Sequence, residues 1–271
     1  PTAPTNRTIH TSPTVYAPEA TTHGHPGDRI ASAAAILALD GVAKAPKTAR
    51  RGDPSTAMMA PNRWPDKPSG FKKSIIEYDT AMRWLGERML DIISMSLDVD
   101  REYFIDKFDH QSSVGRVIRY PAIQRSIEEG QLRAGEHTDY GTITFLRGDP
   151  VPGGTEVRTP DGKWVEVRCP EGGFVCNIGD ALSRWTNGLW KSTLHRVGNP
   201  PRGTDNIDRI SLVYFHSPNH DAIIECVPSC IGDGPKFEPV TFAQHYLDKV
   251  MKAAHARLNA SSVDASKQKK N

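Results

Sequence analysis

The sequence contains few cysteines, no long apolar run and no strong excess of charge. Four cysteines in 271 residues are too few for a disulfide framework, and they form no CxxC pair of the kind that binds structural zinc. No apolar stretch approaches the roughly 20 residues needed to span a bilayer, and the opening residues lack the pattern of a signal peptide. The formal net charge of +2 is too small to indicate a nucleic-acid-binding surface. We therefore expect a soluble, cytoplasmic protein with reduced thiols, partnered by neither a membrane nor a nucleic acid.

Composition and periodicity divide the chain into two parts. Residues 1–66 are rich in Pro, Thr and Ala and predict an irregular N-terminal arm with one short helix at 29–40. We expect residues 67–271 to form a single domain. Apolar residues recur every three or four positions after Pro68, which predicts helical support over 71–108. A second helix is expected near the C-terminus, over about 241–258.

Between these helices, from about 114 to 228, the apolar pattern becomes that of β-strands. The segments are short, β-branched or aromatic, and separated by Gly, Pro, Asp and Asn: VIRY, TITFL, EVR, KWVEV, FVCNI, STLHRV and RISLVYF. Asn187-Gly188 is typical of a hairpin turn. Strands at this spacing, without intervening helices, predict a mainly β fold with flanking helices, in which the sheet is an antiparallel sandwich or barrel.

The stretch GEHTDYGTITF places His137 and Asp139 two residues apart at the head of a predicted strand. In an extended segment, side chains two residues apart point to the same face. His195, in KSTLHRV, is a third candidate ligand on a later strand. Two imidazoles and one carboxylate leave three coordination positions open, which suits non-haem Fe(II). A closed zinc site would need a fourth protein ligand, and the sequence offers no obvious one.

The stretch RIS supplies a second pair with the same alternation, Arg209 and Ser211. A guanidinium beside a hydroxyl forms a receptor for a carboxylate. The alternative is that Arg209 pairs with a neighbouring Asp or Glu. Next to a candidate iron site, we favour a bound anion.

Several motifs in this order resemble the isopenicillin N synthase-like family of Fe(II)/2-oxoglutarate-dependent dioxygenases. They are GEHTDYGTITFL, GGTEV, DGKWVEV, FVCNIGDALSRWTNGLWKSTLHRV and RISLVYFHSPN, and the resemblance runs from about Val117 to Ile224. It implies a double-stranded β-helix, or jelly roll. It also implies that His137, Asp139 and His195 bind Fe(II), and that Arg209 and Ser211 hold the far carboxylate of 2-oxoglutarate.

The resemblance further implies the activity of the chain. The expected enzyme uses Fe(II), 2-oxoglutarate and O2, with ascorbate as a supporting reductant, and releases succinate and CO2. It hydroxylates, desaturates or rearranges a small organic molecule of secondary metabolism. Tyr120, before the proline of VIRYP, matches a position that often donates a hydrogen bond to the cosubstrate; alternatively it only packs at a strand end.

Two rival functions stay open at this point. One is an oxidase of the same family that does not use 2-oxoglutarate, and the other is a catalytically silent jelly-roll metal-binding protein. The chain also departs from the family pattern: Thr155 and Glu156 replace an apolar and an amide residue, and Gly148 stands where glutamine is common. His216 and His220 are interpreted as loop or rim residues rather than ligands.

Overall fold

The computed structural model describes residues 34–38, 62, 64–123, 130–201, 203–204 and 207–268. Its strands form a five-stranded antiparallel sheet in the order β1-β2-β9-β4-β7 and a four-stranded sheet in the order β3-β8-β5-β6. The strands of the larger sheet are β1 (Ala34–Ala38), β2 (Val114–Tyr120), β4 (Ile143–Gly148), β7 (Val175–Ile178) and β9 (Arg209–His216). Those of the smaller sheet are β3 (Ala134–His137), β5 (Thr155–Arg158), β6 (Trp164–Glu166) and β8 (His195–Val197).

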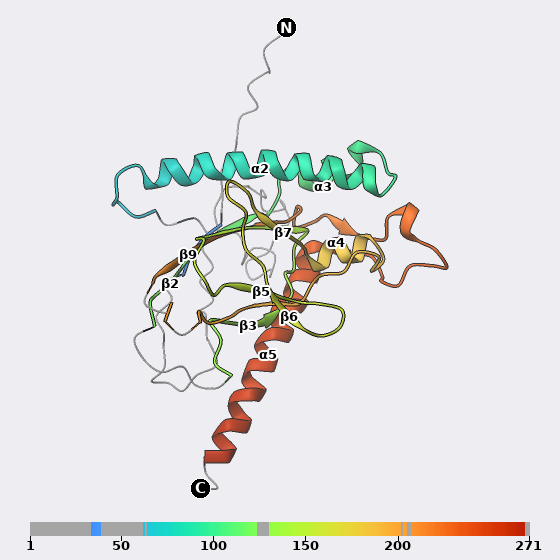
Figure 1. Ribbon diagram of the computed structural model, residues 1–271. Coiled ribbons are helices and arrows are strands. Elements are labelled where there is room, and N and C mark those ends of the chain that lie inside the picture. Colours follow the sequence, from blue (N-terminus) through green and yellow to red (C-terminus); the bar gives the residue numbers. More distant parts are fainter. Residues whose placement is uncertain are drawn as a thin grey trace, which may run out of the picture.

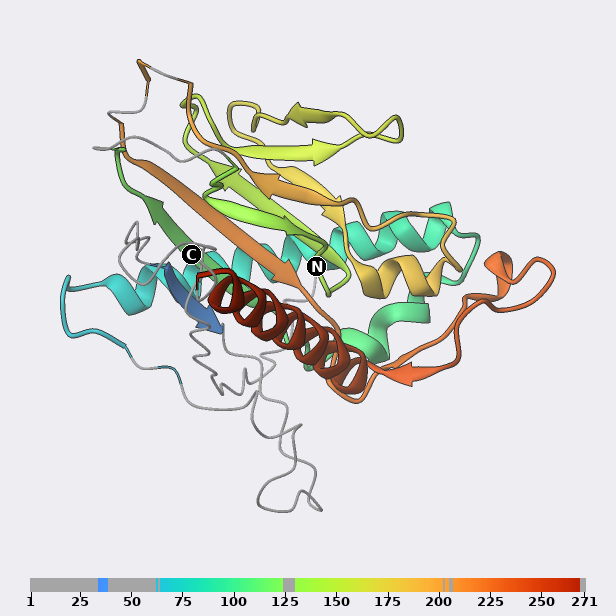
Figure 2. The same ribbon diagram turned by 90° about the horizontal axis from the view of Figure 1, so that it is seen from below.

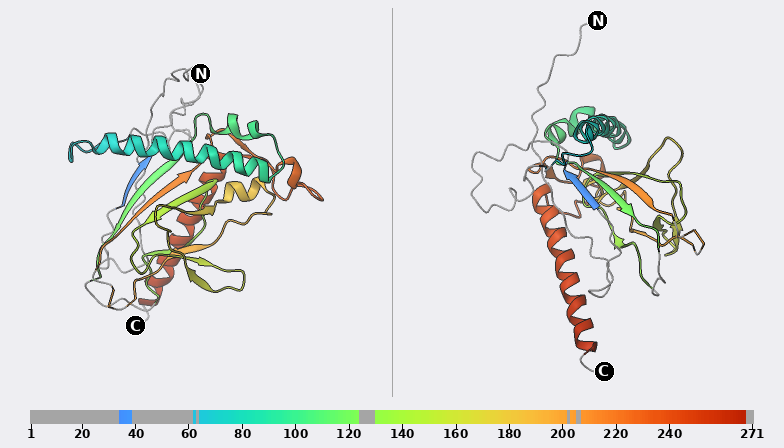
Figure 3. Two further views of the ribbon diagram at one scale, coloured as in Figure 1. Left: turned by 45° about the horizontal axis from the view of Figure 1, so that its top comes forward. Right: turned by 90° about the vertical axis from the view of Figure 1, so that its left-hand side faces the viewer.

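The helices lie on the outside of these sheets (Figures 1 and 3). The long ones are α2 (Phe71–Ser96), which crosses the larger sheet, and α5 (Phe242–Gln268), which runs beside the sheets toward the C-terminus (Figure 2). The shorter elements are η1 (Arg101–Phe104), α3 (Ile105–Phe108), α4 (Asp180–Trp185), β10 (Ile223–Ile224), η2 (Pro228–Cys230) and β11 (Val240–Thr241). The expected mainly β jelly roll with flanking helices is confirmed.

The larger sheet has a core face and a polar face because side chains alternate along its strands. Tyr214 of β9 is fully buried on the α2 side, where its hydroxyl donates to Asp79 of α2 at 2.9 Å. Phe145 pairs with Tyr214 across the strands and is also buried there. Met82 and Leu90 of α2 fill the same core, as the three- and four-residue spacing predicts. The opposite face of this sheet is turned toward the smaller sheet.

Two of the predicted local structures are wrong. The helix expected at 29–40 is instead the strand β1 over Ala34–Ala38, which pairs with β2; most of the predicted N-terminal arm lies outside the described residues. Helix propensity is a weak preference, and pairing with an open sheet edge satisfies the backbone equally well. Asn187 and Gly188 do adopt the left-handed conformation typical of their types, but they terminate α4, where Gly188 N–H donates to the Ser183 carbonyl. The predicted hairpin is therefore a helix end.

The predicted locations of two histidines are also wrong. His216 and His220, expected at a loop or rim, are both buried, and His216 has no exposed surface. His216 stacks on Phe108 with ring centroids 4.8 Å apart. His216 is the last residue of β9 and lies on the core face of that strand, so the buried part of the strand extends one residue beyond its apolar segment. The C-terminal helix also continues beyond the predicted residue 258, to Gln268.

Candidate functional site

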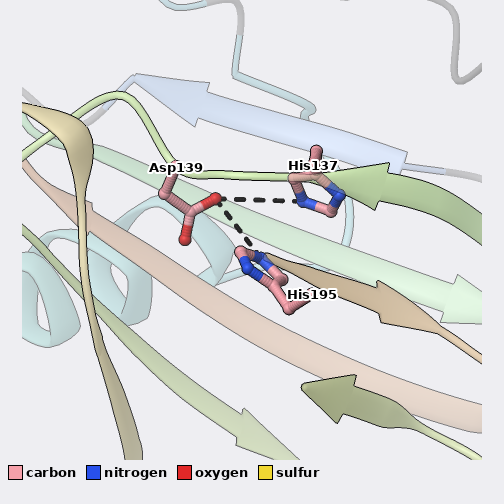
Figure 4. Close-up of side chains that lie close together, drawn as sticks. All are labelled: His137, Asp139 and His195. Carbon is pink, nitrogen blue, oxygen red and sulfur yellow. Dashed lines mark ion pairs between the residues drawn. The ribbon is translucent and has the colours of Figure 1, made fainter. Parts of the chain in front are cut away.

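Three side chains from two neighbouring strands meet at one end of the smaller sheet. His137 ends β3, Asp139 follows two residues later, and His195 begins β8 directly opposite His137. Their ligand atoms all lie within 4.8 Å of one another. Figure 4 shows the three side chains pointing toward a common centre. The structure therefore brings together the three residues that the sequence selected as candidate ligands.

The hydrogen bonds of the two imidazoles leave one nitrogen of each ring available to a metal. His137 Nδ1 lies 2.8 Å from the Gly135 carbonyl, and His195 Nδ1 lies 3.0 Å from the Thr193 carbonyl. Because a carbonyl can only accept, each Nδ1 carries a proton, and in the neutral ring Nε2 keeps its lone pair. These Nε2 atoms lie 3.9 Å (His137) and 3.6 Å (His195) from Asp139 Oδ1. Both lone pairs therefore face the same carboxylate oxygen.

The two oxygens of the Asp139 carboxylate make different contacts. Its Oδ2 accepts hydrogen bonds from Thr144 Oγ1 at 2.6 Å and from Asn177 Nδ2 at 2.7 Å. Its Oδ1 faces the two histidines. Thr144 and Asn177 belong to β4 and β7, so the larger sheet orients a ligand that follows a strand of the smaller one. The arrangement suits a carboxylate that binds a cation through one oxygen.

The ionisation of the site favours metal binding. Burial raises the pKa of Asp139, but the neighbouring His195 and the hydrogen bonds from Thr144 and Asn177 outweigh burial and lower it to about 2. Burial and the charge of His195 lower the pKa of His137. Burial also acts to lower the pKa of His195, yet its closer contact with Asp139 raises it overall. At neutral pH the site thus contains a carboxylate and at least one neutral imidazole, the forms that bind a divalent cation.

Arg209 and Ser211 point from β9 to the polar face of the larger sheet, where both are buried. The guanidinium carbon of Arg209 lies 5.4 Å from the centre of the Tyr120 ring, the residue opposite it on β2. Within the described part of the chain, Arg209 forms no ion pair, and its buried Nη1 has no hydrogen-bond partner. A buried guanidinium without a carboxylate partner is costly unless an anion binds there. This geometry argues against the alternative that Arg209 pairs with a neighbouring acid.

Two glycines make room for this guanidinium. A Cβ on Gly148 would lie 2.6 Å from Arg209 Nη2, and one on Gly154 would lie 3.2 Å from the same atom. The departure from the family pattern at Gly148 is therefore matched to the position taken by Arg209. The departure at Glu156 also has a partner, because its Oε2 accepts a hydrogen bond from Arg196 Nε at 2.6 Å, next to His195.

Sequence reasoning did not identify Thr144 and Asn177, the donors to Asp139. Both are polar residues within apolar strand segments, TITFL and FVCNI, which is the signal that could have found them. Tyr120 is buried and contacts Arg209 as described, and burial raises the pKa of its phenol despite the opposing charge of Arg209. It therefore stays a neutral hydrogen-bond donor at neutral pH.

Comparisons with known proteins place this site in a family. Residues 113–218 match the model of the 2OG-Fe(II) oxygenase superfamily. The chain is 34% identical over 212 residues to Homoarginine-6-hydroxylase 2-ODD-233 of Oryza sativa subsp. japonica, a match that covers 74% of this chain and 62% of that protein. A full-length Neurospora crassa protein, crystallised with alpha-KG and 5-formyluracil, is 31% identical with a TM-score of 0.68, covering 80% of this chain and 67% of that one.

A further structure, a 2OG-Fe(II) oxygenase family protein from Caulobacter crescentus, superimposes with a TM-score of 0.70 at 29% identity, over 81% of this chain and 69% of that one. The chain belongs to the 2OG-Fe(II) oxygenase superfamily. It spans about three fifths of the length of curated relatives that it matches. No helix among the described residues is long and apolar enough to cross a membrane.

Proposed function

We propose that the chain is a non-haem Fe(II)- and 2-oxoglutarate-dependent oxygenase that oxidises a small organic molecule and releases succinate and CO2. The reaction is a hydroxylation, a desaturation or a ring rearrangement, and the substrate class includes natural products. The observation that carries the proposal is the convergence of His137, Asp139 and His195, whose ligand atoms all lie within 4.8 Å of one another. Family membership and the unpartnered guanidinium of Arg209 support it.

In this proposal each group has a separate task. His137, Asp139 and His195 hold Fe(II), and Arg209 with Ser211 holds the far carboxylate of 2-oxoglutarate, with Tyr120 as a neutral donor beside them. Bound Fe(II) supplies the oxidising chemistry with O2 and 2-oxoglutarate. The protein fixes the ligands through Thr144 and Asn177, which prevent rotation of the Asp139 carboxylate. The side chains of Asp139 and His195 are 4% and 12% exposed, whereas that of His137 is 44% exposed, so the site is open to solvent on the His137 side.

The relatives support a small-molecule substrate. By name, they include hydroxylases of homoarginine, a validamycin A dioxygenase from Streptomyces hygroscopicus subsp. limoneus, and a Neurospora crassa protein crystallised with thymine. These molecules share no scaffold, so the names define a size class rather than a substrate. The expectations that the chain works in the cytoplasm and binds no nucleic acid stay predictions.

Metal binding and turnover can be measured on the same preparation. Purified protein supplied with Fe(II), ascorbate and 2-oxoglutarate should form succinate, and more of it when a substrate is present. His137→Ala should abolish both metal binding and succinate formation, whereas His255→Ala, an exposed histidine of α5, should preserve both. O2 consumption without succinate would identify the oxidase that does not use 2-oxoglutarate. Metal binding without consumption of O2 would favour the catalytically silent protein.

A further inference from the structure

A second arginine, Arg116, lies on the polar face of the larger sheet. On β2, Arg116 pairs with Val213 of β9, and Tyr120 pairs with Arg209. Directly paired residues of antiparallel strands share a face, and so do residues an even number of positions apart. Arg116 is therefore on the same face as Arg209, displaced by four residues, or about 13 Å, along the strands.

The position of Asp139 identifies what this face is turned toward. Thr144 of β4 pairs with Phe215 of β9, which is two residues from Val213, so Thr144 shares the face of Arg116. The hydroxyl of Thr144 donates directly to Asp139 Oδ2. Arg116 thus lies on the wall of the site that carries the metal-ligand contacts, at the end away from Arg209.

Arg116 has no partner for its charge. In the described ranges its side chain makes no ion pair and no hydrogen bond, and its Nε atom is buried. Arg119, three residues later on the same strand, shows the ordinary alternative: it faces outward and pairs with Asp208, with Nε 2.8 Å from Oδ2. A guanidinium on an inward face without a carboxylate partner indicates a site that is completed by an anionic ligand.

The electrostatic neighbours of Arg116 belong to the metal site and its rim. Burial lowers the pKa of its guanidinium, and the nearby Tyr120, Tyr246 and Asp139 partly offset that effect. Arg116 also contributes to the lowered pKa of His137, after burial and His195. Tyr246 belongs to α5 and packs edge-on against Tyr140, with centroids 5.7 Å apart. An anion on Arg116 would therefore lie beside the metal ligands, next to an aromatic pair that can contact an apolar body.

We propose that Arg116 is the receptor for a carboxylate of the oxidised substrate, separate from the receptor that Arg209 provides for 2-oxoglutarate. The inference rests on the proposed function and narrows its substrate class to small organic acids, amino acids included. Arg209 and Arg116 mark the two ends of one polar face, with the metal ligands opposite it. A carboxylate bound at Arg116 holds the rest of the substrate near the metal, because a bidentate guanidinium fixes both position and direction.

Matched acids and amides test the charge requirement directly. The protein is loaded with Mn(II) and 2-oxoglutarate, and binding is measured by calorimetry for hexanoate against hexanamide, and for L-homoarginine against its amide. For at least one pair the wild type should bind the acid about ten- to a hundredfold more tightly than the amide, the value of a hydrogen-bonded charge pair. Arg116→Gln should remove that preference, and Arg116→Lys should retain part of it. Arg119→Gln, the outward-facing neighbour, should leave the preference unchanged.

Each outcome decides a specific point. Equal binding of acid and amide by the wild type, or no binding of any acid, overturns the proposal, and so does an acid preference that survives in Arg116→Gln. If Arg116→Gln instead weakens the binding of 2-oxoglutarate itself, the guanidinium serves the cosubstrate and the assignment is wrong. Succinate formation by the Fe(II)-loaded wild type is measured in parallel. An Arg116-dependent acid preference without succinate would refute the proposed oxygenase activity while preserving the anion receptor.

Discussion

Helix α2 crosses the larger sheet at Gly86, next to His216 of β9. This contact predicts that Gly86→Ala destabilises the wild-type protein but stabilises a variant that lacks the His216 ring. A Cβ on Gly86 would lie 2.5 Å from Cδ2 of His216 and closer still to its Nε2. The ring of His216 is fully buried and held on Phe108, so it cannot rotate away without repacking the core. Gly86→Ala should therefore force α2 away from β9.

The size of the effect follows from two opposing contributions. Overpacking a rigid core costs about 1–3 kcal/mol. Replacing glycine by alanine inside a helix increases the free energy of unfolding by about 1 kcal/mol, because alanine has the higher helix propensity. The difference leaves a net loss, and we expect Gly86→Ala to reduce the free energy of unfolding by up to about 2 kcal/mol. In the His216→Ala background the obstructing ring is absent, so the same substitution should stabilise the protein by up to about 1 kcal/mol.

Urea unfolding of the wild type, both single variants and the double variant completes the cycle and gives the coupling energy. Mn(II) affinity, measured on the folded proteins, should be the same in the wild type and Gly86→Ala because the substitution acts on the core face of the sheet. If Gly86→Ala destabilises the protein equally with and without the His216 ring, the close approach of α2 to β9 is not what glycine is needed for.

Three further predictions concern ionisation and ligands. Burial lowers the pKa of His216 to about 3 from an ordinary 6.5, so between these pH values the unfolded state binds a proton that the folded state does not, and stability falls as pH falls. From pH 6.5 to 4.5 the free energy of unfolding of the wild type should decrease by ~2 kcal/mol more than that of His216→Ala. Urea unfolding that shows the same pH dependence for both proteins would contradict this. Thr144→Val, which removes the 2.6 Å hydrogen bond to Asp139, should weaken Mn(II) binding about tenfold in calorimetry. The control Thr159→Val, a half-buried position between β5 and β6, should leave Mn(II) binding unchanged. An unchanged affinity of Thr144→Val would mean that Asn177 alone orients the carboxylate. Arg209→Ala should raise the KM for 2-oxoglutarate at least tenfold in the succinate assay without changing Mn(II) affinity, and an unchanged KM would remove Arg209 from the cosubstrate site.

The candidate ligands could be predicted from the sequence because their chemistry is visible in single residues. His137 and Asp139 stand out as polar side chains at the head of an apolar strand, and His195 is the histidine of a second one. The hydrogen bonds that orient them could not be predicted. Asn177 reaches Asp139 only because β7 pairs with β4, and no pattern within either segment fixes that pairing.

The errors in the predicted fold share a physical cause. Asn187-Gly188 requires a left-handed backbone, and both hairpin turns and helix ends use that conformation. The local signal was therefore correct, while the element it belongs to depends on the α4 packing around Trp185. Similarly, the apolar residues of 34–38 suit a helix or a strand, and pairing with β2 decides between them. Local sequence restricts the backbone, and tertiary contacts select among the remaining structures.

Side chains on one face of β9 belong to the candidate site, and those on the other face pack in the core. Arg209 and Ser211 face the metal side, whereas Tyr214 and His216 face α2. Because neighbouring residues point to opposite faces, a one-residue slip of β9 against β2 would exchange the two sets and place the guanidinium in the apolar core. The hydrogen bond from Tyr214 to Asp79 and the close packing of His216 on Gly86 oppose such a slip. The core contacts of α2 thus fix the register that presents Arg209 and, across β2, Arg116 to the metal site.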